Sequence, residues 1–365
     1  MAMASWRNET RSGVPSARLT RAARARSRAD ESPAAADIRV LLETTWATWR
    51  FAAITGLLRI GAFEQLADGA LAIDELAARC GANPEILRRV LRSVAATGLL
   101  RSAGPRRYEL TDAGRAVMDG WAFAGFRFNA DPEIWNALGE LTETIRSGKA
   151  PFIDRYGGLY GYLATRPETA AGFDALVKGT AAPAASALAQ AIDFAKLGTV
   201  VDVGGGHGGF ITAILQAHPG VRGILTELDR AVPAARAQLA AHGLSDRCDV
   251  VACDFFTDPL PPGAGGYLLA HIIHNWNDEQ ALAILRSVRA AIPDGGRLLL
   301  VEAIVPDDDS PHLTKDLDIR LITILPGGGR TESEYARLLA EAGFRPEPAA
   351  PLARIESVMV AIPTS

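Results

Sequence analysis

The feature that most constrains the fold is a glycine-rich turn that directly follows a short run of β-branched residues. Residues 199–203 read TVVDV, and residues 204–209 read GGGHGG. Glycine tolerates positive φ and lets a ligand approach the backbone, and a helix that follows such a turn offers free N–H groups. We therefore predict a buried strand over 199–203, a ligand-binding turn, and a helix over 210–217.

Strand-like runs alternate with helical segments through the rest of the C-terminal half. The further runs cover residues 223–226, 248–251, 266–270, 297–301 and 357–362. This alternation is typical of an α/β fold with a doubly wound parallel sheet. We assign residues 198–365 to one domain built on such a sheet, with the glycine turn at its ligand site.

Three segments precede this domain. Residues 1–36 mix Arg, Ser and Pro without helical apolar spacing, which predicts a disordered basic leader rather than a transit peptide. Residues 37–127 combine a long helical stretch with two short helices and a hairpin, a winged-helix-like pattern. Residues 128–197 are predicted to be a helical connector that contributes to a substrate pocket.

A winged helix has two common uses. It can place its second helix in the major groove of DNA, and Arg88, Arg89 and Arg92 keep that reading open. It can also serve as a dimerisation module attached to an enzyme, which fits the large α/β domain behind it better. The net charge of −4 gives no reason to expect nucleic acid or membrane partners. No apolar run approaches the roughly 20 residues of a membrane span, and three unpatterned cysteines suggest a reducing, cytoplasmic setting.

The glycine turn fits two cofactors. Its spacing satisfies the dinucleotide pattern G-x-G-x-x-G, which alone is weak evidence. With Asp202 included it also reads D-x-G-x-G-x-G, the pattern of S-adenosylmethionine enzymes. Glu227 follows the second strand, where either cofactor would use a carboxylate for its ribose. Asp254 follows the third strand beside two phenylalanines, where an adenine would be read, so S-adenosylmethionine is the better fit.

Five motifs in a fixed order carry a resemblance to a known family. They are the segments 202–206 (DVGGG), 254–256 (DFF), 274–278 (HNWND), 293–297 (PDGGR) and 328–332 (GGRTE). From about residue 38 onward the chain resembles the S-adenosylmethionine-dependent small-molecule O-methyltransferases of the plant caffeate type and their bacterial antibiotic-pathway relatives. Segments 155–157, 226–228 and 275–276 look most like the anthracycline branch, which includes a hydroxylase. The resemblance implies a Rossmann-like catalytic domain behind a winged-helix dimerisation domain, a homodimer, an aromatic secondary metabolite as acceptor, and no metal.

The resemblance also implies roles for individual residues. Arg155 would pair with the methionine carboxylate of S-adenosylmethionine, since a guanidinium suits that partner. Asp202 belongs to the cofactor motif. The other expected cofactor contacts are Gly204 and Gly205 at the methionine end, Glu227 at the ribose, and Asp254, Phe255 and Trp276 at the adenine. S-adenosylhomocysteine would be the product. The expected walls of the acceptor pocket are Trp135, Phe152, Phe173, Asn275, Ile319 and Ile322.

His274 is the expected general base, because family members that methylate phenols use this histidine. A phenol with an ordinary pKa near 10 can pass its proton to an imidazole when the transfer is concerted with methyl transfer. Glu302 matches the first of two acids that orient the histidine in plant members. The second position is Gly329 here, with Glu332 nearby, and the usual HDW reads HNW. Taken alone, a histidine such as His274 is more commonly a satisfied histidine at a helix end.

Several alternatives stay open. His271 precedes His274 by three residues, so on a helix both would share a face and could bind a metal with Asp316, Asp318 or His312. The same cofactor site could serve C- or N-methylation, or a cofactor-retaining hydroxylase. A DNA-binding regulator is the remaining alternative.

Overall fold

The computed structural model describes residues 33–118 and 120–364. Residues 1–32 of the predicted leader lie outside the described residues. Residues 33–36 were also assigned to the leader, but they form the first turn of helix α2 (Pro33–Arg59). None of the described helices is both long and apolar enough to cross a membrane.

The N-terminal part has the predicted winged-helix arrangement. Helices α4 (Ile73–Cys80) and α5 (Pro84–Ala95) are joined by a tight turn, and the wing follows them. Asn83 caps α5, because its side chain accepts hydrogen bonds from the N–H groups of Glu85 and Ile86 at 3.0 and 3.1 Å. The remaining elements of this part are α3 (Ala62–Gln65), α6 (Asp112–Met118) and the antiparallel strands β1 (Leu71–Ala72), β2 (Leu100–Ser102) and β3 (Arg107–Leu110), in the order β1-β3-β2.

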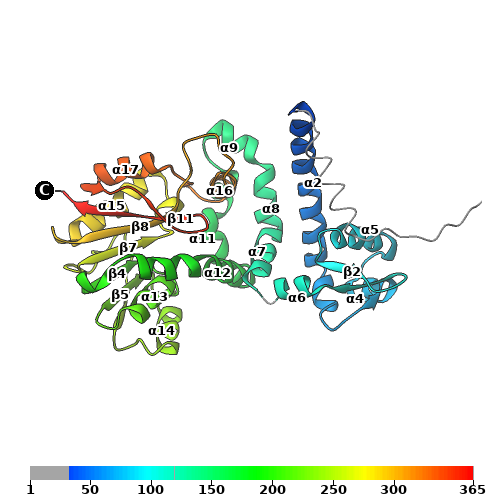
Figure 1. The fold of residues 1–365 in the computed structure, drawn as a ribbon, viewed down its shortest axis with the longest axis horizontal. Coiled ribbons are helices and arrows are strands. Elements are labelled where there is room, and N and C mark those ends of the chain that lie inside the picture. Colours follow the sequence, from blue (N-terminus) through cyan, green and yellow to red (C-terminus); the bar gives the residue numbers. More distant parts are fainter. Residues whose placement is uncertain (1–32, 119, 365) are drawn as a thin grey trace, which may run out of the picture.

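A helical connector joins the winged helix to the α/β domain, and its first helix begins at Trp121, before the predicted start at residue 128. Figure 1 shows α7 and α8 between the winged helix and the α/β domain. The connector comprises α7 (Trp121–Ala130), α8 (Pro132–Gly139), α9 (Leu141–Ser147), α10 (Pro151–Tyr156), α11 (Gly158–Leu163), α12 (Pro167–Ala191) and the 3-10 turn η1 (Phe194–Lys196). The long helix α12 reaches from α7 to α13 and so ties the connector to the sheet.

The C-terminal domain is a mixed sheet in the order β10-β11-β8-β7-β4-β5-β6, with β9 paired to β11. The five strands β4 to β8 run parallel, as predicted. The last strand, β11, runs antiparallel to β8, so the expectation of a wholly parallel sheet was wrong at this edge. The strands of the C-terminal domain are β4 (Thr199–Val203), β5 (Arg222–Glu227), β6 (Cys248–Ala252), β7 (Gly266–Ala270), β8 (Arg297–Ala303), β9 (Phe344–Pro346), β10 (Ala350–Ala353) and β11 (Glu356–Pro363).

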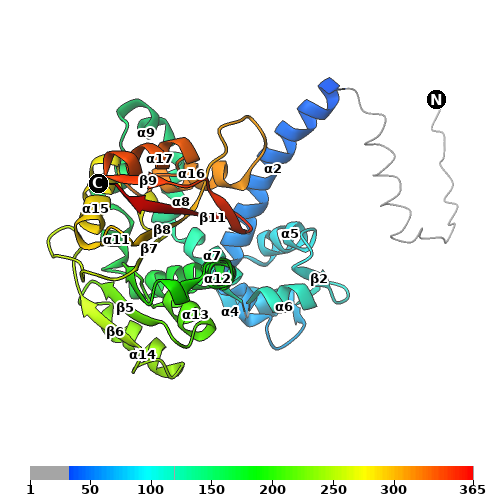
Figure 2. The ribbon, with the colours of Figure 1, turned by 60° about the vertical axis from the view of Figure 1, so that its left-hand side comes forward.

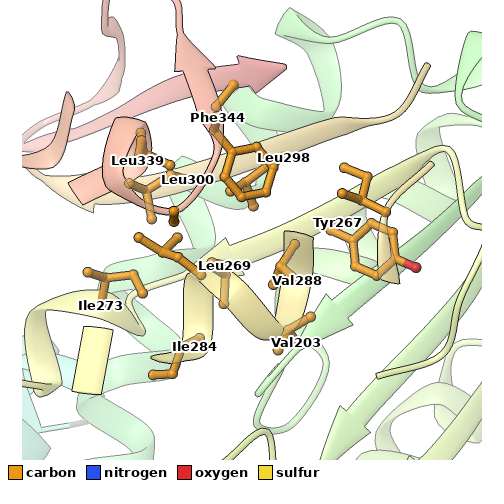
Figure 3. Packing of buried hydrophobic residues seen from close by; sticks show 14 of the residues in the cluster. Val203, Tyr267, Leu269, Ile273, Ile284, Val288, Leu298, Leu300, Leu339 and Phe344 are labelled. Atoms are coloured by element: carbon orange, nitrogen blue, oxygen red, sulfur yellow. The ribbon is translucent and has the colours of Figure 1, made fainter. Parts of the chain in front are cut away.

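Helices cover both faces of this sheet. One buried cluster joins the sheet to α15 (Asp278–Ala291) and α17 (Glu332–Glu341), and Figure 3 shows part of it around Leu269 and Leu300. The other joins the sheet to α12, α13 (Gly209–Ala217) and α14 (Val232–Ala241). Burial of these two apolar faces is the main driving force for the three-layer arrangement. Helix α16 (Leu313–Ile322) lies beyond β8, close to the connector.

Candidate active site

The glycine turn between β4 and α13 adopts the backbone that its composition predicted. Gly204, Gly206 and Gly208 have φ values of 66, 56 and 81°, a region that other residues rarely occupy. The N–H of Gly204 donates to the Thr226 carbonyl at 2.9 Å, which fixes the turn against β5. A Cβ atom on Gly204 would lie 2.9 Å from Ile272 Cδ1, whereas at Gly206 it would meet nothing within 4 Å. The turn is therefore packed on one side and open on the other.

Asp202 lies under this turn and is almost fully buried, with 1% of its surface exposed. Its Oδ2 atom has no hydrogen-bond partner among the described residues. Burial raises the pKa of Asp202 to about 7, and the Glu227 carboxylate adds to that shift. A buried polar atom without a partner costs free energy unless a ligand or water satisfies it. Asp202 therefore fits a turn that is completed by a polar ligand.

The residues expected around an adenosine converge at the edge of the sheet where β4, β5 and β6 end. The Phe255 ring would lie 3.3 Å from a Cβ on Gly204, and it packs edge-on against Trp276 at 6.1 Å. Glu227 ends β5, and its carboxylate accepts from the Leu228 N–H at 2.5 Å. Asp254 Oδ1 accepts from the Phe256 N–H at 3.0 Å, which is the turn-capping role that any Asp here could have. The predicted carboxylates and aromatic platform thus face one edge together.

His274 and Glu302 form a hydrogen-bonded pair near the carboxyl ends of strands β7 and β8. His274 lies in the 3-10 turn η2 (Ile273–Asn275) after β7, and Glu302 lies on the neighbouring strand β8. The distance from His274 Nδ1 to Glu302 Oε2 is 2.5 Å. Burial raises the pKa of Glu302, but the charge of the neighbouring His274 and its hydrogen bond outweigh that effect, so the pKa lies below its ordinary value. Glu302 is therefore an anion that holds one imidazole nitrogen.

Glu302 also anchors the turn that carries His274. Its Oε1 accepts the N–H of Ile273 at 2.8 Å and that of His274 at 3.4 Å. Ile273 itself is buried in the core between the sheet and α15 (Figure 3). The imidazole is thus held by its own hydrogen bond and by the backbone on which it sits. The side chain of His274 keeps 19% of its surface exposed, so its other nitrogen remains accessible.

The second orienting acid of the plant enzymes has no equivalent that contacts His274. The Gly329 N–H donates to Asp318 Oδ1 at 2.6 Å, and a Cβ on Gly329 would lie 3.3 Å from the Asp318 carboxyl carbon. Glu332, which lies nearby in sequence, accepts instead from the Ala349 N–H at 2.9 Å. Glu302 is therefore the carboxylate bonded to this histidine in the described part of the chain.

Arg330 is a positioning residue to which the sequence analysis gave no role, although it lies in the last motif. Its guanidinium is 7% exposed and donates to the carbonyls of Ile273 and Trp276 at 3.1 and 2.8 Å. It also pairs with Asp278 at 2.8 Å, where α15 begins. One cation therefore ties both ends of the η2 turn to α15. The motif shows that a cation is present at position 330. It does not show the groups that this cation binds, because they lie far away in the sequence.

We expect Arg330→Met to lower the free energy of unfolding by about 2–5 kcal/mol, because it removes the donor from two main-chain carbonyls and the partner of the half-exposed Asp278 carboxylate. Urea denaturation followed by circular dichroism measures this. The exposed Arg337 also pairs with Asp278, at 2.6 Å, and provides the control. Arg337→Met should cost no more than about 1 kcal/mol. Equal losses in the two variants would contradict the anchoring role of Arg330.

His271 does not share a helix face with His274, so that expectation was wrong. It follows β7 directly, has a φ of 57°, and lies outside any helix. The two imidazole centroids are 6.0 Å apart. No group of three or more His, Cys, Asp or Glu side chains is placed to hold a metal ion within the described ranges, and this includes the alternative set with Asp316, Asp318 and His312.

Three other predicted site residues are bound by, or packed against, other groups of the protein. The Arg155 guanidinium is bound by the Glu140 carboxylate, with Nη1 to Oε1 at 2.7 Å. Asn275 is buried and donates to the His271 carbonyl at 2.9 Å. Phe152 is fully buried between Tyr156 and Tyr162, so it is a core residue here rather than an open wall.

The other predicted pocket walls remain partly accessible. Trp135 stacks on Phe51 of α2 at 5.2 Å, and Phe173 packs on Phe128 at 5.1 Å. Ile319 on α16 is 42% exposed, and Ile322 on the same helix lies beside Gly328. These four side chains come from the connector helices α8 and α12 and from α16.

Tyr160 on α11 also faces the site, a position that the sequence marked only as part of an aromatic-rich stretch. Its ring is 40% exposed, yet burial by surrounding protein raises its pKa to about 12. The carboxylates of Glu227, Glu302 and Asp174 contribute to this rise in the pKa. Tyr160 therefore lies close enough to these carboxylates for their charge to act on its hydroxyl.

Comparison with known proteins decides the family. Residues 138–345 match the O-methyltransferase domain, and residues 47–120 match the O-methyltransferase dimerisation domain. The chain belongs to the O-methyltransferase family. Phenazine O-methyltransferase of Lysobacter antibioticus is 32% identical over 89% of this chain and 96% of its own length. The aclacinomycin 10-hydroxylase of Streptomyces purpurascens, an anthracycline-pathway relative, is 34% identical over 79% of this chain and 80% of its own.

Solved structures of family members share the fold. The mitomycin 7-O-methyltransferase superposes with a TM-score of 0.82 at 30% identity, covering 90% of this chain and 98% of the other. A neocarzinostatin-pathway O-methyltransferase has a TM-score of 0.75 at 33% identity, with coverages of 86% and 95%. That enzyme was solved with S-adenosylmethionine and 2-hydroxy-5-methyl naphthoic acid. The predicted Rossmann-like methyltransferase fold behind a dimerisation domain is thus confirmed, and this chain is an O-methyltransferase family enzyme.

Proposed function

We propose that this enzyme transfers a methyl group from S-adenosylmethionine to a hydroxyl group of an aromatic secondary metabolite, of the polyketide or phenolic acid type. The observation that carries the proposal is the 2.5 Å contact between His274 and a buried glutamate at the edge of the sheet that holds the glycine turn. Relatives that act on phenazine and naphthoate rings support an aromatic acceptor for this chain.

The residues around the glycine turn fit this donor. Gly204 and Gly205 would lie along its methionine end, and Asp202, whose Oδ2 atom lacks a hydrogen-bond partner among the described residues, lies beneath them. Glu227 would accept from ribose hydroxyls, while Asp254, Phe255 and Trp276 would hold the adenine. Arg155 would have to leave Glu140 to reach the methionine carboxylate. The sulfonium of the bound donor supplies an electrophilic methyl group.

The protein's own contribution is to hold the acceptor oxygen and take its proton. The Glu302 anion accepts from Nδ1–H of His274, which leaves Nε2 as the acceptor. As the new O–CH₃ bond forms and the S–CH₃ bond breaks, the hydroxyl proton passes to Nε2. Alignment of the oxygen with the methyl carbon supplies much of the remaining rate enhancement.

The experiment that tests this function is incubation of the purified protein with S-adenosylmethionine and a panel of hydroxylated aromatics. We expect S-adenosylhomocysteine to form in proportion to an O-methylated product. Products methylated on carbon or nitrogen would replace the O-methyl assignment. Absence of S-adenosylhomocysteine with every acceptor would overturn methyl transfer itself.

A cofactor-retaining hydroxylase is the second candidate, because a hydroxylase stands among the relatives. It would give an oxygen-dependent product and no S-adenosylhomocysteine. The His274–Glu302 pair favours methyl transfer, since a held base next to the acceptor has a direct use in that reaction.

We also propose that the enzyme works as a homodimer formed through its N-terminal domain. Figure 2 shows the first half of α2 extending away from the rest of the molecule. Large apolar side chains between residues 38 and 49 of α2 are exposed: Ile38 59%, Leu41 70%, Leu42 44%, Trp46 46% and Trp49 63%. Such a stretch of apolar surface marks an interaction site, and it runs into the matched dimerisation domain, which begins at residue 47.

The double substitution Leu41→Glu and Trp49→Glu should therefore convert the dimer to a monomer, because it places charges in an apolar interface. Size-exclusion chromatography with light scattering measures the mass. Ile145→Glu on α9 is the control, since Ile145 is equally exposed, at 73%, but lies outside α2. A double variant that keeps the mass of the parent protein would refute the α2 interface.

A further inference from the structure

His271 has an unusual backbone conformation that the structure fixes from both sides. Its φ of 57° lies in the left-handed region, which in the described residues only two other non-glycine residues, Arg106 and Arg354, occupy. The His271 N–H donates to the Val301 carbonyl at 2.9 Å, and its carbonyl accepts from the buried Asn275 amide at 2.9 Å. Backbone strain of this kind concentrates at functional sites and suggests a use for the side chain.

The His271 imidazole has no hydrogen-bond partner of its own. No hydrogen bond to either ring nitrogen is found among the described residues, and the nearest charged atom is Glu356 Oε1, 4.0 Å from Nε2. The ring packs edge-on against Phe210 at 5.8 Å, next to the glycine turn. With 20% of the side chain exposed, the nitrogens remain within reach of a ligand.

The ring is neutral at physiological pH. Burial, helped by the neighbouring His274 and opposed by Glu302, lowers the pKa of His271 to about 4. The other titratable group that faces it, Glu356, is 6% exposed on β11, and burial raises its pKa. A neutral imidazole offers one hydrogen-bond donor and one acceptor.

The position of this ring relative to the proposed base suggests what it binds. The centroids of His271 and His274 are 6.0 Å apart. Two neighbouring oxygens on an aromatic ring are separated by about one hydrogen-bond length, roughly 2.7 Å. The two rings are therefore close enough for one ligand with two such oxygens to contact a nitrogen of each.

We propose that His271 is a specificity residue that binds a second oxygen of the acceptor, next to the hydroxyl that is methylated. The acceptor class is then an aromatic ring with two neighbouring oxygen functions, as in a catechol, rather than an isolated phenol. This inference rests on the proposed function, because it places the reacting oxygen at His274. Glu356 would bind the outer side of the imidazole through a water molecule across the 4.0 Å gap.

The test measures binding of 2,3-dihydroxynaphthalene and of 2-naphthol to the full-length protein with S-adenosylhomocysteine, by tryptophan fluorescence, and their turnover with S-adenosylmethionine. We expect the parent protein to favour the diol by at least tenfold, because a site built around a hydrogen bond discriminates against ligands that lack it. His271→Gly, which accepts the positive φ, should bring this ratio close to one while 2-naphthol binding changes little. His271→Asn also tolerates this φ and is too short to reach, so it should behave in the same way if the glycine variant does not fold.

Arg106→Gly is the matched control, because Arg106 has a φ of 52° in the distant wing and its replacement should leave the ratio unchanged. A parent protein that binds both compounds equally, or a His271 variant that keeps the preference for the diol, would overturn the proposal. Either result can occur while methyl transfer continues. Failure of the proposed function would instead appear as no S-adenosylhomocysteine from any acceptor, and the binding ratio could still be read.

Discussion

Replacement of His274 by alanine is expected to lower the rate of methyl transfer by about 10²–10⁴-fold, the range contributed by a positioned general base. The affinity for S-adenosylmethionine should stay unchanged, because the imidazole is held by Glu302 and not by the glycine turn. Single-turnover kinetics with saturating donor, together with calorimetric titration of the donor, separate the two quantities.

Two further variants make this result specific. Glu302→Gln keeps the size of the buried side chain but removes the anion that holds Nδ1–H, so it should lose much of the same activity. His242→Ala changes an exposed histidine at the end of α14 and should leave turnover as it was. Full activity in His274→Ala would show that the acceptor loses its proton by another route, and the base assignment would be abandoned.

The second large effect is expected at the glycine turn. A Cβ atom on Gly205 would lie 2.6 Å from both Cγ and Oδ2 of Asp202. Asp202 is buried in β4 and cannot move aside without disturbing the sheet. Overpacking of this kind costs about 1–3 kcal/mol, so Gly205→Ala should weaken donor binding by roughly tenfold to a hundredfold. Calorimetric titration of S-adenosylmethionine and S-adenosylhomocysteine measures the loss.

Gly209 supplies the matched control in the same turn. It is the first residue of α13, its φ is not positive, and an added Cβ would meet nothing within 4 Å. Gly209→Ala should therefore bind the donor as the parent does. If Gly205→Ala bound the donor normally, the close approach of the turn to Asp202 would have no role in the cofactor site.

The arrangement of the α/β domain was largely readable from the sequence. Short apolar runs bounded by glycine predicted strands β4 to β8, and each is found within two residues of its expected bounds. The direction of β11 could not be read in this way, because a strand has the same pattern of side chains whichever way it runs. Its antiparallel pairing follows from contacts with β8 that the pattern does not encode.

The site was predictable where motifs lie next to strand ends, and less so where it depends on distant contacts. Asp202, Glu227 and Asp254 end or follow β4, β5 and β6, so the topology alone brings them to one edge. Arg330 contacts Ile273 and Trp276 across more than fifty residues of chain, which periodicity cannot show. The backbone of His271 depends on Asn275 and Val301, and the sequence alone suggested a helix there instead.

The measurement that tests the central claim most directly uses S-adenosylmethionine labelled with a trideuteriomethyl group and a hydroxylated aromatic acceptor. Mass spectrometry and NMR of the product then locate the label. The account predicts an intact trideuteriomethyl group on a ring oxygen, with one S-adenosylhomocysteine for each product molecule, and loss of both in His274→Ala. An unlabelled, oxygen-dependent product without S-adenosylhomocysteine would contradict it.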